Sequence, residues 1–291
     1  MIIDCHAHLW KTQQGKVDGR DVFALNNGKS NFGGEIRQMM PPYMFNGENT
    51  AEMFLSNMDY AGVSGAVITQ EEIDGNQDGY LLTAKEKYPG RLKICSLYEE
   101  NKPFTLDGFD GIKICAGRLH TQDLTKHDKV FEQANKEHKF ISIDLADGDT
   151  QTGSLLEMIQ QYPKLRIAIG HFGMVTRDGW KEQIKLARNK NACVESGGIT
   201  WLFNSEFYPY PSAVRAIKEA AELCGMEKLM WGSDYPRTMV EITYKMSFDF
   251  ILKSKELTEA EKTAFLFENA KDFYGFSNLT ECERIKNMLE D

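Results

Sequence analysis

The sequence alternates regularly between segments typical of buried strands and segments typical of helices. Eight short, mostly apolar segments have strand character, at residues 1–8, 65–69, 92–98, 111–115, 140–145, 165–171, 192–196 and 229–234. Most are separated by segments with helical spacing of apolar residues, at 50–60, 78–88, 123–137, 153–162, 180–188 and 212–224. Repeated strand–helix–strand units predict an α/β fold with a parallel sheet, and eight such units closing on themselves form a (β/α)8 TIM barrel.

An open, doubly wound sheet is the alternative arrangement of such units. It normally carries a glycine-rich phosphate loop after an early strand. No Gly-x-Gly-x-x-Gly pattern follows residues 1–8, so the sequence favours the barrel and indicates no nucleotide site. A length of 291 residues suits one barrel. We expect a single barrel domain over residues 1–276, with C-terminal helices near 240–253 and 258–274, and a helical tail at 277–291.

A long segment with weak periodicity, residues 9–49, separates the first strand from the first helix. It is rich in glycine, and a loop of this length in a compact domain is usually functional or disordered. The aromatic and methionine side chains near its end argue against disorder: Met39, Met40, Tyr43, Met44 and Phe45. We therefore predict a long loop that forms a lid or wall over the end of the first strand.

Composition and charge exclude several classes of partner. The net charge of −9 and the pI near 5.3 argue against binding to nucleic acid or to an anionic membrane, since both need clustered positive charge. No apolar run approaches the ~20 residues of a membrane span, and the N-terminal residues do not resemble a signal peptide. The six cysteines form no Cys-x-x-Cys pair, so we expect reduced thiols and a cytoplasmic protein.

Four of the predicted strands end in residues that can perform chemistry. His6 and His8 end the first strand, Asp144 lies in the fifth, His171 ends the sixth and Asp234 ends the eighth. The carboxyl ends of barrel strands meet at one rim, where the active sites of such enzymes lie. We therefore expect these five side chains to meet at one site.

The first strand has a pattern of its own. Side chains at alternate strand positions share a face. Asp4, His6 and His8 are therefore expected on one face, with Cys5 and Ala7 on the other.

Three of these motifs together resemble the amidohydrolase-2 family within the amidohydrolase superfamily. They are the His6-x-His8 pair, His171 followed by Phe-Gly, and Gly-Ser-Asp-Tyr-Pro at residues 232–236. The resemblance runs over residues 2–276 and implies a metal-dependent TIM-barrel hydrolase. It includes two branches, of which the decarboxylases carry a third metal-binding histidine on the fifth strand. This chain has Asp144 there, and its residues 4–10 and 143–173 are similar to the lactonase branch.

The resemblance implies an activity and a set of site residues. The implied reaction is hydrolysis of a lactone, or a similar cyclic ester bearing a carboxylate, with Asp234 as the base that activates water and His171 as a second catalytic residue. One divalent metal ion, Zn²⁺ by the chemistry of its ligands, would be held by His6, His8, Asp234 and Asp144. The alternatives are metal-dependent non-oxidative decarboxylation of an aromatic or unsaturated acid, and a catalytically silent binding barrel.

Several cationic residues lie where they could bind a carboxylate of a small-molecule substrate. Arginine pairs with carboxylates through two parallel hydrogen bonds. Among the candidates, Lys113 is notable because a strand of a parallel barrel is buried on both faces. The others are Arg118, His120, Arg177 and Arg237. The resemblance also makes a homodimer an expectation, since proteins of the family often form dimers.

Overall fold

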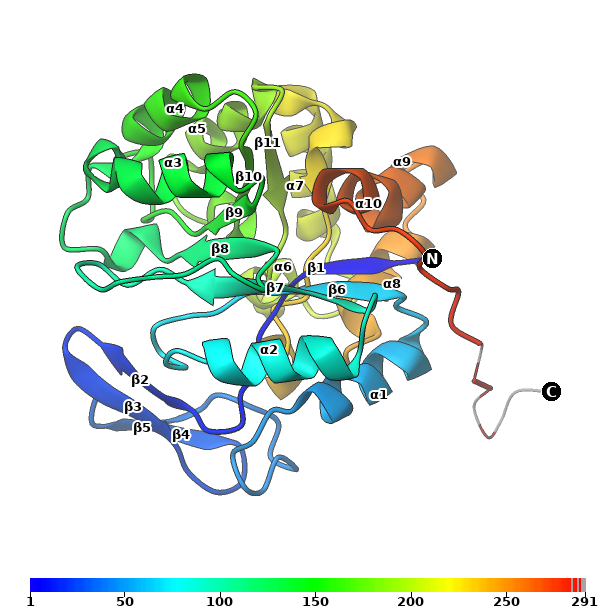
Figure 1. Ribbon diagram of the computed structural model, residues 1–291. Helices are drawn as coiled ribbons and strands as arrows, with labels where there is room; N and C mark the ends of the chain where they lie inside the picture. Colours follow the sequence, from blue (N-terminus) through cyan, green and yellow to red (C-terminus); the bar gives the residue numbers. More distant parts are fainter. Residues whose placement is uncertain (284, 287, 289–291) are drawn as a thin grey trace.

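The computed structural model describes residues 1–283, 285, 286 and 288, and its centre is a parallel barrel (Figure 1). The eight strands lie in the order β1 (Ile3–Ala7), β6 (Gly65–Ile68), β7 (Leu92–Leu97), β8 (Gly111–Ile114), β9 (Phe140–Ile143), β10 (Arg166–Ile169), β11 (Ala192–Glu195) and β12 (Leu229–Met230). The barrel closes between its first and last strands, where the Cys5 amide donates to the Trp231 carbonyl at 2.9 Å and a parallel bridge joins Ala7 to Tyr235. The predicted TIM barrel is confirmed.

Helices surround the barrel as the apolar spacing predicts. They are α1 (Ala51–Ala61), α2 (Asp78–Lys87), α3 (Asp128–Lys136), α4 (Thr152–Gln161), α5 (Trp180–Lys185), α6 (Ile199–Leu202), α7 (Pro211–Cys224), α8 (Met246–Lys253), α9 (Glu259–Thr263) and α10 (Asn269–Tyr274). Helix α1 begins at Thr50, whose side chain caps the Met53 amide, and ends at Gly62 in the left-handed conformation. In the described part of the chain no helix is long and apolar enough to cross a membrane.

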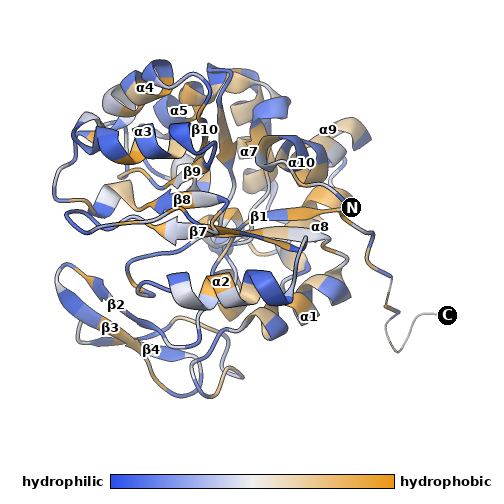
Figure 2. Ribbon diagram, viewed as in Figure 1, coloured by the Kyte–Doolittle hydropathy of each residue, from blue (hydrophilic) through white to orange (hydrophobic). Residues whose placement is uncertain are grey.

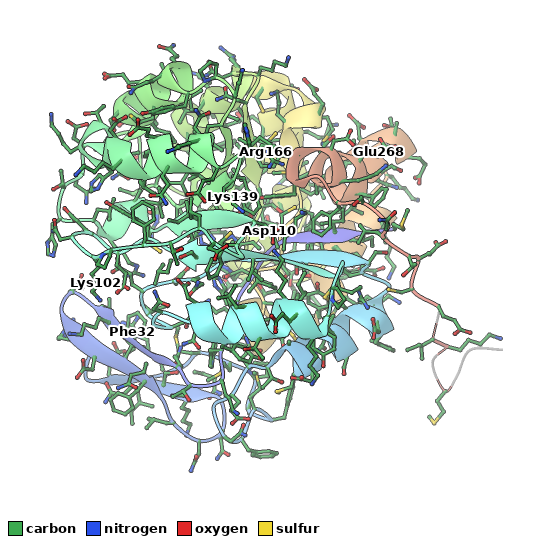
Figure 3. All side chains as sticks on the ribbon, viewed as in Figure 1. Phe32, Lys102, Asp110, Lys139, Arg166 and Glu268 are labelled. Atoms are coloured by element: carbon green, nitrogen blue, oxygen red, sulfur yellow. The ribbon has the colours of Figure 1, made fainter. Side chains whose placement is uncertain are left out.

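The core has an outer layer between strands and helices and an inner layer inside the barrel. The barrel strands are largely apolar whereas α2 and α4 carry polar residues on their outer faces (Figure 2), and side chains fill the space between them (Figure 3). The inner layer joins residues from strands around the barrel to α10: Ile3, Cys5, Val67, Cys95, Phe140, Ala168, Cys193, Met230, Ala270 and Tyr274. Helix α10 thus closes the amino-terminal end of the barrel, and the opposite end remains for a site.

Strand β1 departs from simple alternation. Its pairing with β6 shifts register between Asp4 and Ala7. Cys5 packs in the inner layer, whereas the Asp4 carboxylate accepts a hydrogen bond from Tyr244 Oη at 2.7 Å, in the layer between barrel and helices. The prediction that Asp4 shares a face with His6 and His8 is therefore wrong, because an irregularity within the strand changes the alternation.

The segment predicted as a long loop contains a four-stranded antiparallel sheet, which we call the cap. Its strands are β2 (Gln14–Val17), β3 (Arg20–Ala24), β4 (Lys29–Phe32) and β5 (Glu35–Gln38), in that order. Two-residue turns, Asp18-Gly19 and Gly33-Gly34, join the first and last pairs of strands, and all four turn residues have positive φ. Asp-Gly and Gly-Gly are strong hairpin signals, and the interpretation as a loop overlooked them.

The cap lies against the loop that follows β6, at the carboxyl end of the barrel strands. The Lys16 amide donates to the Glu72 carbonyl at 2.9 Å, so β2 is hydrogen-bonded to that loop. On the same side of the cap, Val17 and Val22 pack with Ile73. The cap is therefore positioned to form a wall over the barrel mouth.

The tail also differs from its prediction. Helix α10 ends at Gly275 in the left-handed conformation. Residues 277–283, which were expected to begin a helical tail, contain no helix. Positions 284, 287 and 289–291 of that predicted helix lie outside the described residues.

Candidate active site

A cavity of about 1120 Å³ opens at the carboxyl end of the barrel, between the strand ends and the cap. Phe32, Arg37 and Met39 line it from the cap side. From the barrel side it is lined by charged and aromatic groups that include Glu71, Asp144, His171, Trp201, Asp234 and Arg237. Asp144, His171 and Asp234, three of the site residues predicted from strand ends, therefore meet at this rim, and the buried His6 and His8 lie beside Asp234.

The most compact group in the site consists of His6, His8 and Asp234. His6 Nε2 lies 3.1 Å from His8 Nε2, and Asp234 Oδ1 lies 3.0 Å from His8 Nε2 and 3.9 Å from His6 Nε2. All three residues are buried. Burial, together with the charge of Arg237, lowers the pKa of His8, so its imidazole is neutral at pH 7. Trp201 donates its indole N–H to the other Asp234 oxygen at 2.8 Å.

The turn that carries Asp234 is held by the buried carboxylate of Asp4. Asp4 accepts hydrogen bonds from the Ser233 amide at 2.8 Å and from the Ser233 hydroxyl. Burial raises the pKa of Asp4 to about 6, although these hydrogen bonds oppose the shift. Asp234 itself adopts a φ of 58°, which a non-glycine residue keeps only where its surroundings enforce it. Asp4 is thus a support for the strand-end turn rather than a member of the site.

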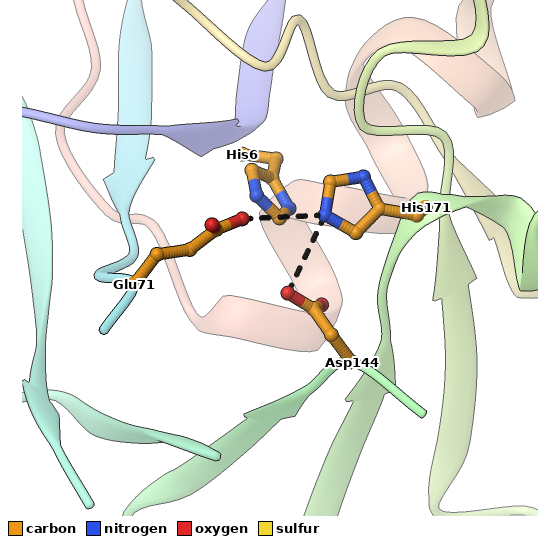
Figure 4. A group of neighbouring side chains, drawn as sticks. All are labelled: His6, Glu71, Asp144 and His171. Atoms are coloured by element: carbon orange, nitrogen blue, oxygen red, sulfur yellow. Dashed lines mark ion pairs between the residues drawn. The ribbon is translucent and has the colours of Figure 1, made fainter. Parts of the chain in front are cut away.

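A second group lies beside the first and is centred on His171 (Figure 4). Its Nε2 lies 3.4 Å from Asp144 Oδ2 and 3.8 Å from Glu71 Oε1, and its ring centroid is 4.6 Å from that of His6. Burial opposes protonation, but the Asp144 and Glu71 carboxylates hold the pKa of His171 well above its ordinary value. His171 is therefore an imidazolium at neutral pH.

Lys113 lies beneath this second group. It is fully buried on β8, and its Nζ is 2.6 Å from Asp144 Oδ2. Burial works against the Asp144 carboxylate, but Lys113 and His171 hold the pKa of Asp144 below its ordinary value. Asp144 belongs to this second group, with His6, Glu71 and His171, rather than to the group of His8 and Asp234.

The remaining predicted cations lie in different surroundings. Arg237 is held within the site, with its Nη2 2.7 Å from Asp74 Oδ2 and its Nη1 3.8 Å from Asp234 Oδ1. Arg118 and His120 are exposed and line the cavity at its rim. Arg177 pairs with exposed Asp147.

Several acidic residues of the site were missed by the reasoning from sequence. Glu195 ends β11 and its Oε1 lies 2.6 Å from His6 Nδ1, while Glu71 and Asp74 come from the loop after β6. The signal for Glu195 was available, because it ends a barrel strand as His171 and Asp234 do. Glu71 and Asp74 carried no comparable signal, since the loop fold decides which of its acidic side chains turn inward.

The arrangement of charge and donor atoms fits a divalent cation. Neutral imidazoles and a carboxylate are ligands that zinc prefers, and neighbouring ligand atoms about 2.1 Å from a tetrahedral zinc are about 3.4 Å apart. The three separations among His6, His8 and Asp234 lie on both sides of that value. Five carboxylates also face three cations here, an excess of two negative charges; the residues are Glu71, Asp74, Asp144, Glu195 and Asp234 against Lys113, Arg237 and the His171 imidazolium.

Comparison with known proteins agrees with the resemblance seen in the sequence. Residues 150–276 match the model of the family described as amidohydrolase, which confirms the recognition of that family in this part of the chain. No curated protein matches the chain.

Solved structures resemble the chain over nearly its whole length. A probable 2-pyrone-4,6-dicarboxylic acid hydrolase from Acinetobacter baumannii, with citric acid bound, is 21% identical with a TM-score of 0.70, over 94% of this chain and 99% of that one. A Pseudomonas putida protein with the same provisional name is 24% identical, with a TM-score of 0.69 over 94% and 97%. An amidohydrolase from Burkholderia multivorans with bound zinc is 13% identical, with a TM-score of 0.67 over 95% and 100%. At these identities the likeness shows the fold alone.

Proposed function

We propose that this protein is a metal-dependent hydrolase. Its residues 150–276 carry the sequence pattern of the amidohydrolase family. Its substrate is a lactone or a similar cyclic ester that bears a carboxylate. The observation that carries the proposal is the convergence of His6 Nε2, His8 Nε2 and Asp234 Oδ1 at the carboxyl end of the barrel, beside His171 at the cavity. The similar fold of two proteins named as pyrone-dicarboxylic acid hydrolases supports this choice of substrate class.

The metal ligands in this proposal are His6, His8 and Asp234. Asp144 was also expected as a ligand, and its pairing with Lys113 favours a supporting role through His171. A divalent ion bound here would act as a Lewis acid and lower the pKa of a bound water. Zinc is the proposed ion, because the donors are imidazole and carboxylate.

In the proposed reaction Asp234 acts as the general base and His171 as the general acid. The Asp234 carboxylate takes a proton from the water that attacks the ester carbonyl, while Trp201 holds its second oxygen in place. The His171 imidazolium stabilises the negative charge that develops on the substrate oxygen, and it donates a proton to the ring oxygen as the C–O bond breaks. The product is a hydroxy acid whose new carboxyl group ionises at neutral pH.

A carboxylate on the substrate would be bound at the rim. Arg118 and His120 line the cavity there, and among the described residues Arg118 forms no ion pair within 4 Å, although its charge acts on the Glu72 carboxyl. Its guanidinium can therefore pair with a substrate carboxylate without first breaking an ion pair. Arg237 is less suited to this role, because Asp74 already holds it.

The experiment is a panel of carboxylated lactones and cyclic esters, assayed for acid release in weak buffer and for products by mass spectrometry. We expect acid release and a product heavier than the substrate by one water. The rate of acid release should fall about 10²- to 10⁴-fold in Asp234→Asn. It should be unchanged in the matched control Asp107→Asn, which alters an exposed position. A substrate that loses the mass of carbon dioxide would favour the decarboxylase alternative. Ligand binding without turnover, retained in Asp234→Asn, would favour the silent binding barrel.

A further inference from the structure

We propose that Glu195 is a positioning residue that fixes which ring nitrogen of His6 faces the active site. This inference rests on the proposed function, because it assigns His6 Nε2 a ligand role. Glu195 ends β11, and its side chain and that of His6 are fully shielded from solvent. Glu195 Oε1 lies 2.6 Å from His6 Nδ1, the ring nitrogen that points away from the group formed with His8 and Asp234.

The chemistry of the pair determines the tautomer of His6. An ionised carboxylate only accepts hydrogen bonds, so Nδ1 must carry the proton at this short distance. In the neutral ring Nε2 then carries a lone pair. The Nε2 atom lies 3.1 Å from His8 Nε2 and 3.9 Å from Asp234 Oδ1. Carboxylates that orient a metal-binding histidine in this way also raise the basicity of the ligating nitrogen. Glu195 thereby prepares Nε2 to bind a cation.

The second oxygen of Glu195 is fixed as well. Glu195 Oε2 accepts a hydrogen bond from the Gly197 amide at 2.6 Å. Both carboxylate oxygens are therefore held, one by the backbone that follows β11 and the other by the histidine. A side chain fixed at both oxygens can impose one orientation on the ring that it contacts.

Three glycines at the ends of three neighbouring strands leave room for this pair. A Cβ on Gly232 would lie 2.7 Å from both Glu195 Oε2 and His6 Cβ, and a Cβ on Gly170 would lie 2.8 Å from Glu195 Oε1 and still closer, at 2.0 Å, to Asp144 Oδ1. A Cβ on Gly197 would lie 2.9 Å from the His6 ring. Real Cβ atoms do not approach this closely, so the backbone around the pair accepts only glycine without displacing His6 or Glu195.

The first measurement concerns the metal-free protein and needs neither metal nor substrate. Ring ¹⁵N shifts of His6, identified by their loss in His6→Asn, report which nitrogen carries the proton. We expect a protonated Nδ1 and a bare Nε2 in the wild type, and a changed tautomer distribution in Glu195→Gln. A wild-type His6 with its proton on Nε2 would overturn the proposal.

The second measurement is the zinc affinity of each variant, determined by titration calorimetry. Circular dichroism first checks that each variant is folded. Loss of an outer partner of a metal ligand typically weakens metal binding about 10- to 100-fold, and we expect this in Glu195→Gln. Gly197→Ala keeps the carboxylate, but its Cβ would lie 2.9 Å from the His6 ring and 3.0 Å from Glu195 Oε2, so it should displace the pair and weaken binding too. The matched control Asp110→Asn removes a part-buried carboxylate that pairs with Lys85 and Lys93 at the amino-terminal end of the barrel, and should leave the affinity unchanged.

The outcomes separate this inference from the proposed function. If the wild type binds no zinc, the metal site in the proposed function fails, and the ¹⁵N shifts still decide the role of Glu195. If the wild type binds zinc and Glu195→Gln binds it equally well, Glu195 has no positioning role. Should Glu195→Gln fail to fold, Gly197→Ala and the wild-type shifts carry the test.

Discussion

The buried pair of Lys113 and Asp144 offers a sharp test of the electrostatics of the site. Lys113→Met keeps the apolar stem of the side chain but removes the charge 2.6 Å from Asp144 Oδ2. Asp144 Oδ1 is buried without a hydrogen-bond partner, so the carboxylate depends on Lys113 and on His171 at 3.4 Å. The variant therefore leaves a poorly compensated negative charge inside the barrel mouth.

The magnitude follows from the burial of the two partners. Removing one member of a buried ion pair costs about 3–5 kcal/mol. Lys113 is fully buried, but the Asp144 side chain is 15% exposed and His171 remains nearby, so we expect the lower end, about 3 kcal/mol. At roughly 2 °C per kcal/mol for a chain of this size, the melting temperature of Lys113→Met should fall by about 6 °C.

The pH dependence has a definite sign. Lys113 holds the pKa of Asp144 below its ordinary value, so its stabilising effect is present above about pH 4, the ordinary pKa of an aspartate, and is lost as the pH falls below that. The gap in melting temperature between wild type and Lys113→Met should therefore be largest near neutral pH. It should narrow below about pH 4.

A double variant identifies the cause. In Lys113→Met/Asp144→Asn the uncompensated charge is gone, so this protein should be more stable than Lys113→Met by about 1.5 kcal/mol or more. The double-mutant cycle is measured by thermal melting of four metal-free proteins: the wild type, Lys113→Met, Asp144→Asn and the double variant. If the two single effects add to the double effect within about 0.5 kcal/mol, the two residues are not coupled and the reasoning is refuted.

Two further predictions concern the metal and the rim. Zinc at 100 times its Kd should stabilise the folded protein by about 2.7 kcal/mol. His8→Asn should abolish that stabilisation. If zinc stabilises this variant as much as it stabilises the wild type, the ion binds elsewhere. Arg118→Ala should raise KM for a carboxylated lactone about tenfold with little change in kcat, whereas Lys102→Ala, which removes an exposed lysine, should change neither. If Arg118→Ala raised KM equally for a lactone without a carboxylate, the assigned role of Arg118 would be contradicted.

The barrel could be predicted because its signal is distributed over the whole chain. Apolar strand segments such as 65–69 and 165–171 match β6 and β10 closely, since a parallel strand buried on both faces needs apolar residues along its length. The cap was missed for the opposite reason. Its strand β5 is exposed at every position, so it shows no alternation, and only its turn residues indicate a hairpin.

The site could be predicted as far as it depends on strand ends. His6, His8, His171 and Asp234 were placed at one rim by topology alone, because parallel strands of a barrel end together. The division into two groups could not be predicted. It depends on Lys113 reaching Asp144 from a neighbouring strand, and the strand register that brings Lys113 beside Ser142 exists only in the folded sheet.

The acidic residues beyond the motifs change the chemistry that the site favours. With the sequence motifs alone, three histidines and two aspartates could form a carbonyl-polarising site without a metal. Glu71, Asp74 and Glu195 add three carboxylates, whereas Arg237 and Lys113 supply two cations that already pair with Asp74 and Asp144. A substrate carboxylate would be repelled from so acidic a floor unless a cation were bound there. The excess of negative charge therefore favours a bound divalent ion, and in the proposed function the exposed Arg118 at the rim binds the substrate carboxylate while the ester carbonyl faces the floor.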